Sequence, residues 1–174
     1  ERELGMKPIL PGFSGHVPGI LKEKFPDAKI SKLQNWAGFR NETSCYFLDP
    51  QDPLFAEIQH RYIKEVIKEF GTDHIYGIDP FNEMKLPSED PAYLSAVAKG
   101  IYSTLTDVDP QATWLQMTWM FYFDKATWTP ERIKAFLEAV PQGKLLLLDY
   151  WGEFQEIWRR TDKYHGQPYL WCYL

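Results

Sequence analysis

Apolar residues recur every three to four positions in three stretches of the chain, a spacing that predicts amphipathic helices. Each stretch begins with the same device, a capping side chain followed by proline: Asp52-Pro53, Asp90-Pro91 and Thr129-Pro130. The polar side chain can accept a backbone N–H, and proline fits the first helical turn. We therefore expect helices that begin at residues 53, 91 and 130, and a fourth helix over residues 154–160.

Short, almost wholly apolar runs lie between these helical stretches. They cover residues 7–13, 74–79, 113–118, 145–149 and 168–174. Such runs are typical of strands that are buried on both faces, as in parallel sheets. The alternation of strand and helix predicts an α/β fold with about five parallel strands. Residues 15–52 follow neither pattern, and we interpret them as a long loop with one short helix.

Two α/β folds fit this order, an open doubly wound sheet and part of a (β/α)8 TIM-type barrel. A complete barrel requires ~250 residues, whereas the chain has 174. The last apolar run reaches the final residue without a helix after it, so we expect a barrel truncated at the C-terminus. The prediction is that residues 1–174 are a fragment of one catalytic domain with no internal boundary.

Composition excludes several classes of function. With 44% hydrophobic and 25% charged residues, the chain is typical of a globular protein. A net charge of -5 and the lack of a basic block argue against binding to nucleic acid or to a membrane surface. No apolar run is long enough to span a bilayer, and the first residues do not form a signal peptide, so we expect any targeting segment to lie outside this chain.

The residues that usually bind metals or nucleotides show no suitable spacing. The four histidines are scattered, and Cys45 and Cys172 are far apart, so we expect no metal site; a disulfide between the two cysteines stays open. No glycine-rich phosphate loop is present, so nucleotide binding has no support. Aromatic residues reach 16%, including 7 Trp. They predict either a large aromatic core or a site that stacks on sugar faces.

Polar and aromatic residues gather where the predicted strands end. Asp79, Asn82 and Glu83 follow the second strand, Trp119 follows the third, and Asp149-Tyr150 ends the fourth. In parallel βα folds the active site lies at the carboxyl ends of the strands. Carboxylates, an amide and aromatic rings together suit a carbohydrate.

Each of these residues also has a structural interpretation. Asp79 and Asp149 could support neighbouring loops, and we favour that role for both. Trp119 and Tyr150 could plug the top of the barrel. Glu83 could be a solvated loop residue, but its position after Asn82 at a strand end favours catalysis.

Four segments carry a resemblance to a known family: MKPILPGFSGHVP (6–18), KEFGTDHIYGIDPFNEM (68–84), WLQMTW (114–119) and GQPYLWCYL (166–174). They resemble the α-N-acetylglucosaminidases of glycoside hydrolase family 89. The resemblance implies a (β/α)8 catalytic domain that removes terminal α-linked N-acetylglucosamine with retention of configuration. It implies no metal or organic cofactor. The implied partners are a carbohydrate with terminal α-N-acetylglucosamine and the remainder of the domain.

The same resemblance implies a role for four residues. Glu83 matches the general acid/base and Asn82 the substrate-binding amide beside it. Trp119 matches a tryptophan that contacts the sugar, and Tyr150 matches a residue that lines the pocket. The family's nucleophile is a second Glu on a later segment, beyond Leu174, so we expect the isolated chain to be inactive. The family location would be secreted or periplasmic in a bacterium and lysosomal in an animal.

The stereochemistry of the substrate agrees with an enzymatic nucleophile. In an α-glucosaminide the 2-acetamido group is cis to the departing oxygen, so it cannot attack the anomeric carbon from the back. The enzyme must then supply a second carboxylate, as in retaining glycosidases. The alternative function is a non-catalytic carbohydrate-binding protein on a degenerate barrel, without the nucleophile. A third interpretation, an open-sheet α/β hydrolase, lacks a G-x-S-x-G motif.

Overall fold

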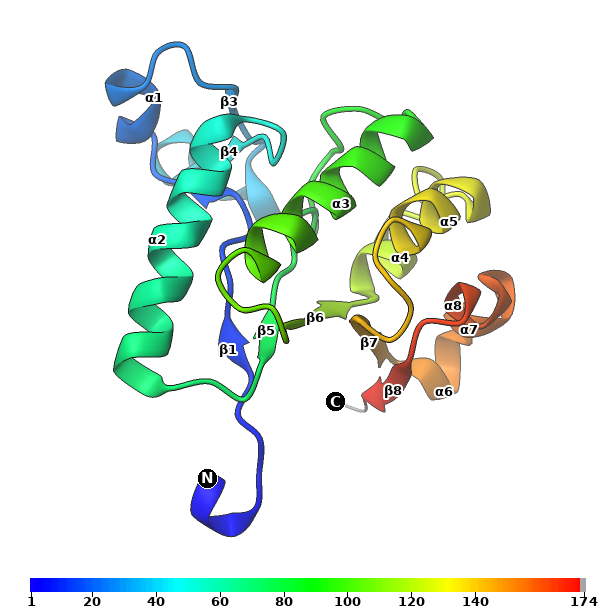
Figure 1. Ribbon diagram of the computed structural model, residues 1–174. Coiled ribbons are helices and arrows are strands. Elements are labelled where there is room, and N and C mark those ends of the chain that lie inside the picture. Colours follow the sequence, from blue (N-terminus) through cyan, green and yellow to red (C-terminus); the bar gives the residue numbers. More distant parts are fainter. Residues whose placement is uncertain (173–174) are drawn as a thin grey trace.

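Five parallel strands form the main sheet of the computed structural model (Figure 1), which describes residues 1–172 apart from the side chains of Thr43 and Cys172. In sheet order the strands are β1 Leu10–Pro11, β5 Ile75–Gly77, β6 Thr113–Met117, β7 Leu145–Tyr150 and β8 Tyr169–Cys172. All four pairings are parallel, and the order across this sheet follows the order along the chain. A doubly wound sheet would reverse its direction of growth. The sheet is therefore part of a (β/α)8 barrel, as predicted.

Three long helices follow the prediction closely. They are α2 Pro53–Phe70, α3 Pro91–Thr106 and α5 Pro130–Glu138. The side chains of Asp52 and Asp90 each accept a backbone N–H at 2.9 Å, and the Thr129 hydroxyl accepts one at 3.4 Å. The helices lie side by side along the sheet (Figure 1), with α3 packed between the other two. Proline and the capping side chain thus set where each helix begins.

An aromatic cluster fills the space between the sheet and the helices. Phe136 of α5 contacts Trp114 of β6 and Trp128, with ring centroids 5.6 and 5.7 Å apart. The indole of Trp114 donates to the carbonyl of Ile78 at 2.7 Å, so its polar atom is satisfied in the core. Part of the high aromatic content therefore belongs to the core, the first of the two interpretations of the composition.

The prediction of one continuous helix over residues 154–160 is wrong. The chain forms two short helices, α6 Gly152–Gln155 and α7 Ile157–Arg160, separated by Glu156 at a φ of 43°. The turn buries Ile157 completely while Phe154 stays 69% exposed. Two further short helices, α4 Trp119–Phe123 and α8 Asp162–His165, were not predicted. Packing of one apolar residue overrides the helical pattern here.

The region interpreted as a long loop contains a second sheet, so that prediction is incomplete. Its antiparallel strands are β2 His16–Val17, β3 Ile30–Lys32 and β4 Tyr46–Leu48, in the order β2-β4-β3. The short helix α1 Ile20–Lys24 lies between β2 and β3, as expected. Gly15 precedes β2 with a φ of 93°, and a Cβ there would lie 2.8 Å from the Phe47 ring. Only glycine fits this close approach of the strands.

None of the helices in residues 1–172 is long and apolar enough to cross a bilayer.

Candidate active site

The carboxylate of Glu83 is held by two tryptophans from distant parts of the chain. The indole N–H of Trp119, at the start of α4, donates to Oε1 at 2.7 Å. The indole N–H of Trp36 donates to Oε2. Glu83 itself has a φ of 50°, a left-handed conformation that is uncommon outside glycine and often found at functional sites. The loop after β5 therefore presents the carboxylate in one fixed position.

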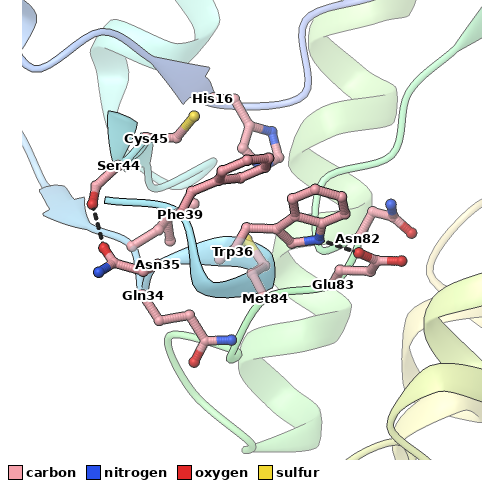
Figure 2. A pocket seen from close by; sticks show the side chains of 11 residues that line it. His16, Gln34, Asn35, Trp36, Phe39, Ser44, Cys45, Asn82, Glu83 and Met84 are labelled. Carbon is pink, nitrogen blue, oxygen red and sulfur yellow. Dashed lines mark hydrogen bonds between the residues drawn. The ribbon is translucent and has the colours of Figure 1, made fainter. Parts of the chain in front are cut away.

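A pocket of about 280 Å³ lies beside Glu83, between the loop after β5 and the segment that joins β3 to β4. Figure 2 shows the Trp36 indole directed at the Glu83 carboxylate, with Asn82 close by and Phe39 on the far side of Trp36. The side-chain oxygen of Asn82 is buried and has no hydrogen-bond partner among the residues that the structure describes. A buried, unpaired acceptor in a pocket wall is available to a ligand donor.

Trp119 is also the centre of an aromatic cluster at the ends of β6 and β7. Its ring centroid lies 5.2 Å from that of Tyr150 and 5.8 Å from that of Trp151. On α4, Tyr122 lies 5.1 Å away. The structure thus brings together Glu83, Trp119 and Tyr150, with Asn82 adjacent in the chain. Tyr150 meets Glu83 through Trp119, and neither of these two aromatic residues is among those that line the pocket.

Asp79 links the ends of three strands. Its Oδ1 accepts the backbone N–H of Met117 at 3.0 Å and a hydrogen bond from the Gln116 amide. Its own N–H donates to Ser14 Oγ at 3.1 Å. Burial raises the pKa of Asp79 to about 6. These contacts match the supporting role favoured from the sequence.

Asp149 is fully buried and links β7 to the residue that precedes Trp119. Its Oδ1 accepts from the Tyr164 hydroxyl at 2.6 Å and from Thr118 Oγ1 at 3.5 Å. Thr118 Oγ1 in turn accepts the N–H of Tyr150 at 3.0 Å. Burial raises the pKa of Asp149. The buried pair of Asp149 and Thr118 therefore fixes the backbone beside both Trp119 and Tyr150.

Within the described part of the chain, no three His, Cys, Asp or Glu side chains are grouped as metal ligands. His16 lines the pocket, and burial lowers its pKa. Cys45 lines the same pocket as an exposed thiol, and the side chain of Cys172 lies outside the described residues.

Comparison with known proteins identifies the family. A model of the α-N-acetylglucosaminidase TIM-barrel domain matches residues 1–174. The chain belongs to this family. Human α-N-acetylglucosaminidase is 46% identical over 174 residues, a match that covers 99% of this chain and 23% of the human protein. The chain therefore spans about a quarter of the length of that relative.

Solved structures of the family share the fold. A family 89 glycoside hydrolase from Clostridium perfringens in complex with PUGNAc matches with a TM-score of 0.77 and 22% identity, over 96% of this chain and 18% of that one. The complex of that enzyme with 2-acetamido-1,2-dideoxynojirmycin gives the same values. A variant of the Clostridium perfringens enzyme was solved with its substrate GlcNAc-α-1,4-galactose, at 21% identity and the same TM-score. The resemblance to family 89 and the barrel prediction are confirmed.

Sequence reasoning missed the contribution of Trp36 and Phe39 to this family 89 site. Both come from the region that was interpreted as a loop, and both are more than half exposed, at 56% and 58%. The signal present in the sequence was the close spacing of Trp36 and Phe39 in a polar, glycine-containing segment, because adjacent exposed apolar side chains form a patch.

Proposed function

We propose that the protein that contains this chain is a retaining α-N-acetylglucosaminidase, which releases terminal α-linked N-acetylglucosamine from glycans. Residues 1–174 would form part of a single (β/α)8 catalytic domain. The observation that carries the proposal is the placement of Glu83. Its carboxylate lies at the carboxyl end of a barrel strand, beside a pocket, and two indole N–H groups orient it. Membership of the α-N-acetylglucosaminidase family supports the choice of sugar.

Glu83 acts as the general acid/base. In the first step it protonates the glycosidic oxygen, and in the second it deprotonates the attacking water. Asn82 binds a substituent of the N-acetylglucosamine ring, for which its unpaired side-chain oxygen is a ready acceptor. Trp119 and Tyr150 present aromatic faces to the apolar side of the sugar. Trp119 also holds Glu83, so it couples substrate binding to the position of the acid.

The nucleophile comes from a segment outside these 174 residues. Among the described residues that line the pocket, Glu83 is the only carboxylate. Asp79 and Asp149 are buried at the strand ends and hold neighbouring polar groups, so neither is suited to attack a sugar. A retaining mechanism needs a second carboxylate ~5–5.5 Å from the first, because the cis acetamido group cannot attack. The isolated chain should therefore be inactive.

The decisive test is Glu83→Gln in the full-length protein, with a series of α-N-acetylglucosaminides of increasing leaving-group ability. For poor leaving groups we expect kcat/KM to fall by roughly 10²–10⁴-fold. The first step on activated aryl glycosides should suffer less, because they need little protonation. Azide, which needs no general base, should restore turnover and yield an α-glycosyl azide, identified by NMR.

Glu89→Gln is the matched control, since Glu89 lies six residues further along the same loop and its side chain is 58% exposed. It should behave as the unmodified protein. A near-normal rate of Glu83→Gln on a poor leaving group would remove Glu83 as acid/base. Sugar binding without hydrolysis by the unmodified protein would favour the non-catalytic carbohydrate-binding alternative.

A further inference from the structure

Asp79 and Gln116 are hydrogen-bonded to each other at the carboxyl ends of β5 and β6. The Gln116 amide donates to Asp79 Oδ1 and also to the Met117 carbonyl, the latter at 2.9 Å. A carbonyl oxygen only accepts, so this second bond fixes the amide with its nitrogen toward Asp79. Gln116 is 1% exposed, and its Oε1 has no partner among the described residues. The pair therefore lacks one donor.

We propose that Asp79 is a neutral carboxylic acid in the working enzyme, and that its pair with Gln116 positions Glu83. An ionised carboxylate only accepts hydrogen bonds, whereas a protonated one also donates. An amide and a carboxylic acid are complementary, because the amide N–H binds one carboxyl oxygen while the amide oxygen accepts the proton carried by the other. The proton of Asp79 thus supplies the donor that Gln116 Oε1 lacks. The proposal rests on the acid/base role of Glu83 given above.

The surroundings of Asp79 favour the neutral form. Among the described residues its partners are a serine hydroxyl, an amide and a backbone N–H, all of them uncharged. Strand β6 carries no ionisable side chain, and the ionisable groups nearest to these partners in the chain are His16, whose pKa burial lowers, and Glu83. Burial raises the pKa of Asp79 itself to about 6. In mildly acidic solution the acid form of Asp79 therefore predominates.

The pair is the first of two links between the segments that follow β5 and β6. Asp79 lies four residues before Glu83, and Gln116 lies three residues before Trp119. The Trp119 indole donates to Glu83 Oε1 at 2.7 Å, which forms the second link. β5 lies between β1 and β6 (Figure 1), and the Asp79 N–H reaches Ser14 after β1 at 3.1 Å. A change in the first link therefore moves the acid relative to its indole donor.

Ionisation of Asp79 weakens the first link. The carboxylate has no proton to donate, so Gln116 Oε1 is again buried without a partner, and such an atom costs stability. A second negative charge also appears on the loop that carries Glu83, where like charges repel each other. We expect Glu83 to be best positioned while Asp79 is neutral, and activity to fall as Asp79 ionises.

The test is Asp79→Asn in the full-length protein, because Asn has the shape of the neutral acid and keeps both a donor and an acceptor. The ratio of kcat/KM for Asp79→Asn to that for the unmodified protein should rise about five- to tenfold between about pH 5 and about pH 7, since only the unmodified protein loses a proton near pH 6. The rise should be greatest for poor leaving groups, which depend most on Glu83 as acid. A ratio that stays constant or falls with pH would overturn the proposal.

Two further variants give the control and the test of the partner. Asp107→Asn changes an aspartate whose side chain is 57% exposed, and its ratio to the unmodified protein should stay constant. Gln116→Met removes both polar atoms of the amide but keeps the length of the side chain. In that background the rise caused by Asp79→Asn should shrink by at least about twofold, because Asn has lost its partner. A rise of the same size would attribute the effect to the charge of Asp79 alone and overturn the pair.

Infrared spectroscopy measures the protonation of Asp79 without any substrate. The unmodified protein at about pH 5 should show a carboxylic acid C=O band that is absent at about pH 7 and absent from Asp79→Asn. Absence of this band would overturn the neutral state of Asp79. A band with the expected pH dependence but a constant kcat/KM ratio would reject only the positioning of Glu83. Failure of the unmodified protein to hydrolyse any α-N-acetylglucosaminide would instead reject the proposed function.

Discussion

Buried carboxylates occur at both ends of the main sheet, and their surroundings differ. At the N-terminal ends of β5 and β6, Asp109 accepts from the Tyr76 hydroxyl at 2.7 Å and the Gln111 N–H at 3.1 Å, and contacts His74 Nδ1 at 2.8 Å. Burial opposes ionisation, but the hydrogen bonds from Tyr76 and His74 hold the pKa of Asp109 below its ordinary value. At the carboxyl ends, burial raises the pKa of both Asp79 and Asp149.

Three of the buried polar atoms that lack a partner lie at the carboxyl ends. Asn82 Oδ1, Gln116 Oε1 and Asp149 Oδ2 are buried there without a hydrogen-bond partner among the described residues. Each such atom costs stability. In barrel enzymes the N-terminal face serves stability and the C-terminal face serves chemistry. Buried atoms without a partner also occur elsewhere, as at Gln59 Oε1 in α2. The difference teaches that the neighbours of Asp109 satisfy its carboxylate, whereas Asp149 at the carboxyl end keeps one unpaired oxygen near the candidate site.

The largest expected effect on stability is at the N-terminal end of the sheet, where Asp109 is fully hydrogen-bonded. Asp109→Ala leaves Tyr76, His74 and Gln111 without their acceptor, so the free energy of unfolding should fall by about 2–4 kcal/mol. Chemical denaturation of the full-length protein measures this. Asp107→Ala is the control, because its pair with His60 is at the surface and its side chain is 57% exposed; it should change stability by less than about 0.5 kcal/mol. If both variants lost the same free energy of unfolding, the stabilising role of the hydrogen bonds to Asp109 would be contradicted.

The buried carboxylates at the two ends of the main sheet should change the free energy of unfolding with pH in opposite directions. The pKa of Asp79 rises from 3.8 to about 6 on folding. Its stabilising contribution is therefore present below pH 3.8 and is lost as the pH rises to about 6, by on the order of 2–3 kcal/mol. The pKa of Asp109 is lowered, so its contribution is present above 3.8 and is lost as the pH falls. Stability curves against pH for Asp79→Asn and Asp109→Asn, each subtracted from the unmodified protein, should slope oppositely; slopes of one sign would contradict this.

A smaller effect is expected from the donor that Trp119 provides to Glu83. Trp119→Phe keeps an aromatic ring beside Tyr150 but removes the N–H that lies 2.7 Å from Oε1. We expect kcat/KM on poor leaving groups to fall about tenfold, since one charge-assisted hydrogen bond is lost, with an unchanged unfolding midpoint. Tyr122→Phe, which removes a hydroxyl from the same cluster, should have little effect. If both variants lost kcat/KM equally, the role of Trp119 would be packing in the aromatic cluster and not the hydrogen bond to Glu83.

The smallest effect concerns the buried link beneath Trp119. Thr118→Val removes the acceptor of the Tyr150 N–H and the donor to Asp149, so the free energy of unfolding should fall by about 1 kcal/mol. Thr118→Ser keeps the hydroxyl and should restore most of this loss. Denaturation of both variants checks it, and a Ser variant as unstable as the Val variant would attribute the effect to packing of the methyl group.

Local patterns predicted the barrel part of the fold well. The Asp-Pro and Thr-Pro pairs located the starts of α2, α3 and α5, because capping and the fixed φ of proline act within a few residues. Apolar runs located all five strands of the main sheet, although β1 is shorter than its run. The small sheet escaped prediction because its strands have two or three residues and pair across a long separation, as His16 does with Phe47.

The candidate site also has one part that the sequence predicted and one part that it did not. The strand-end rule alone selected Asn82, Glu83, Trp119 and Tyr150, and the family resemblance gave them roles that stay proposals. No local pattern predicted that Trp36 would reach the Glu83 carboxylate, because the two residues are 47 positions apart. The break at Glu156 was equally hidden, since it depends on which of Phe154 and Ile157 finds space in the core.

The sequence by itself determined which segments become barrel strands and helices and which polar residues follow each strand, because those properties depend on neighbours within a few positions. Only the tertiary structure decided that Trp36 and Trp119 share one carboxylate, and that a pocket opens beside it. It also decided which buried carboxylates are fully paired and which are not. These features arise from contacts between distant segments, whose geometry is set by the packing of the whole sheet and its helices.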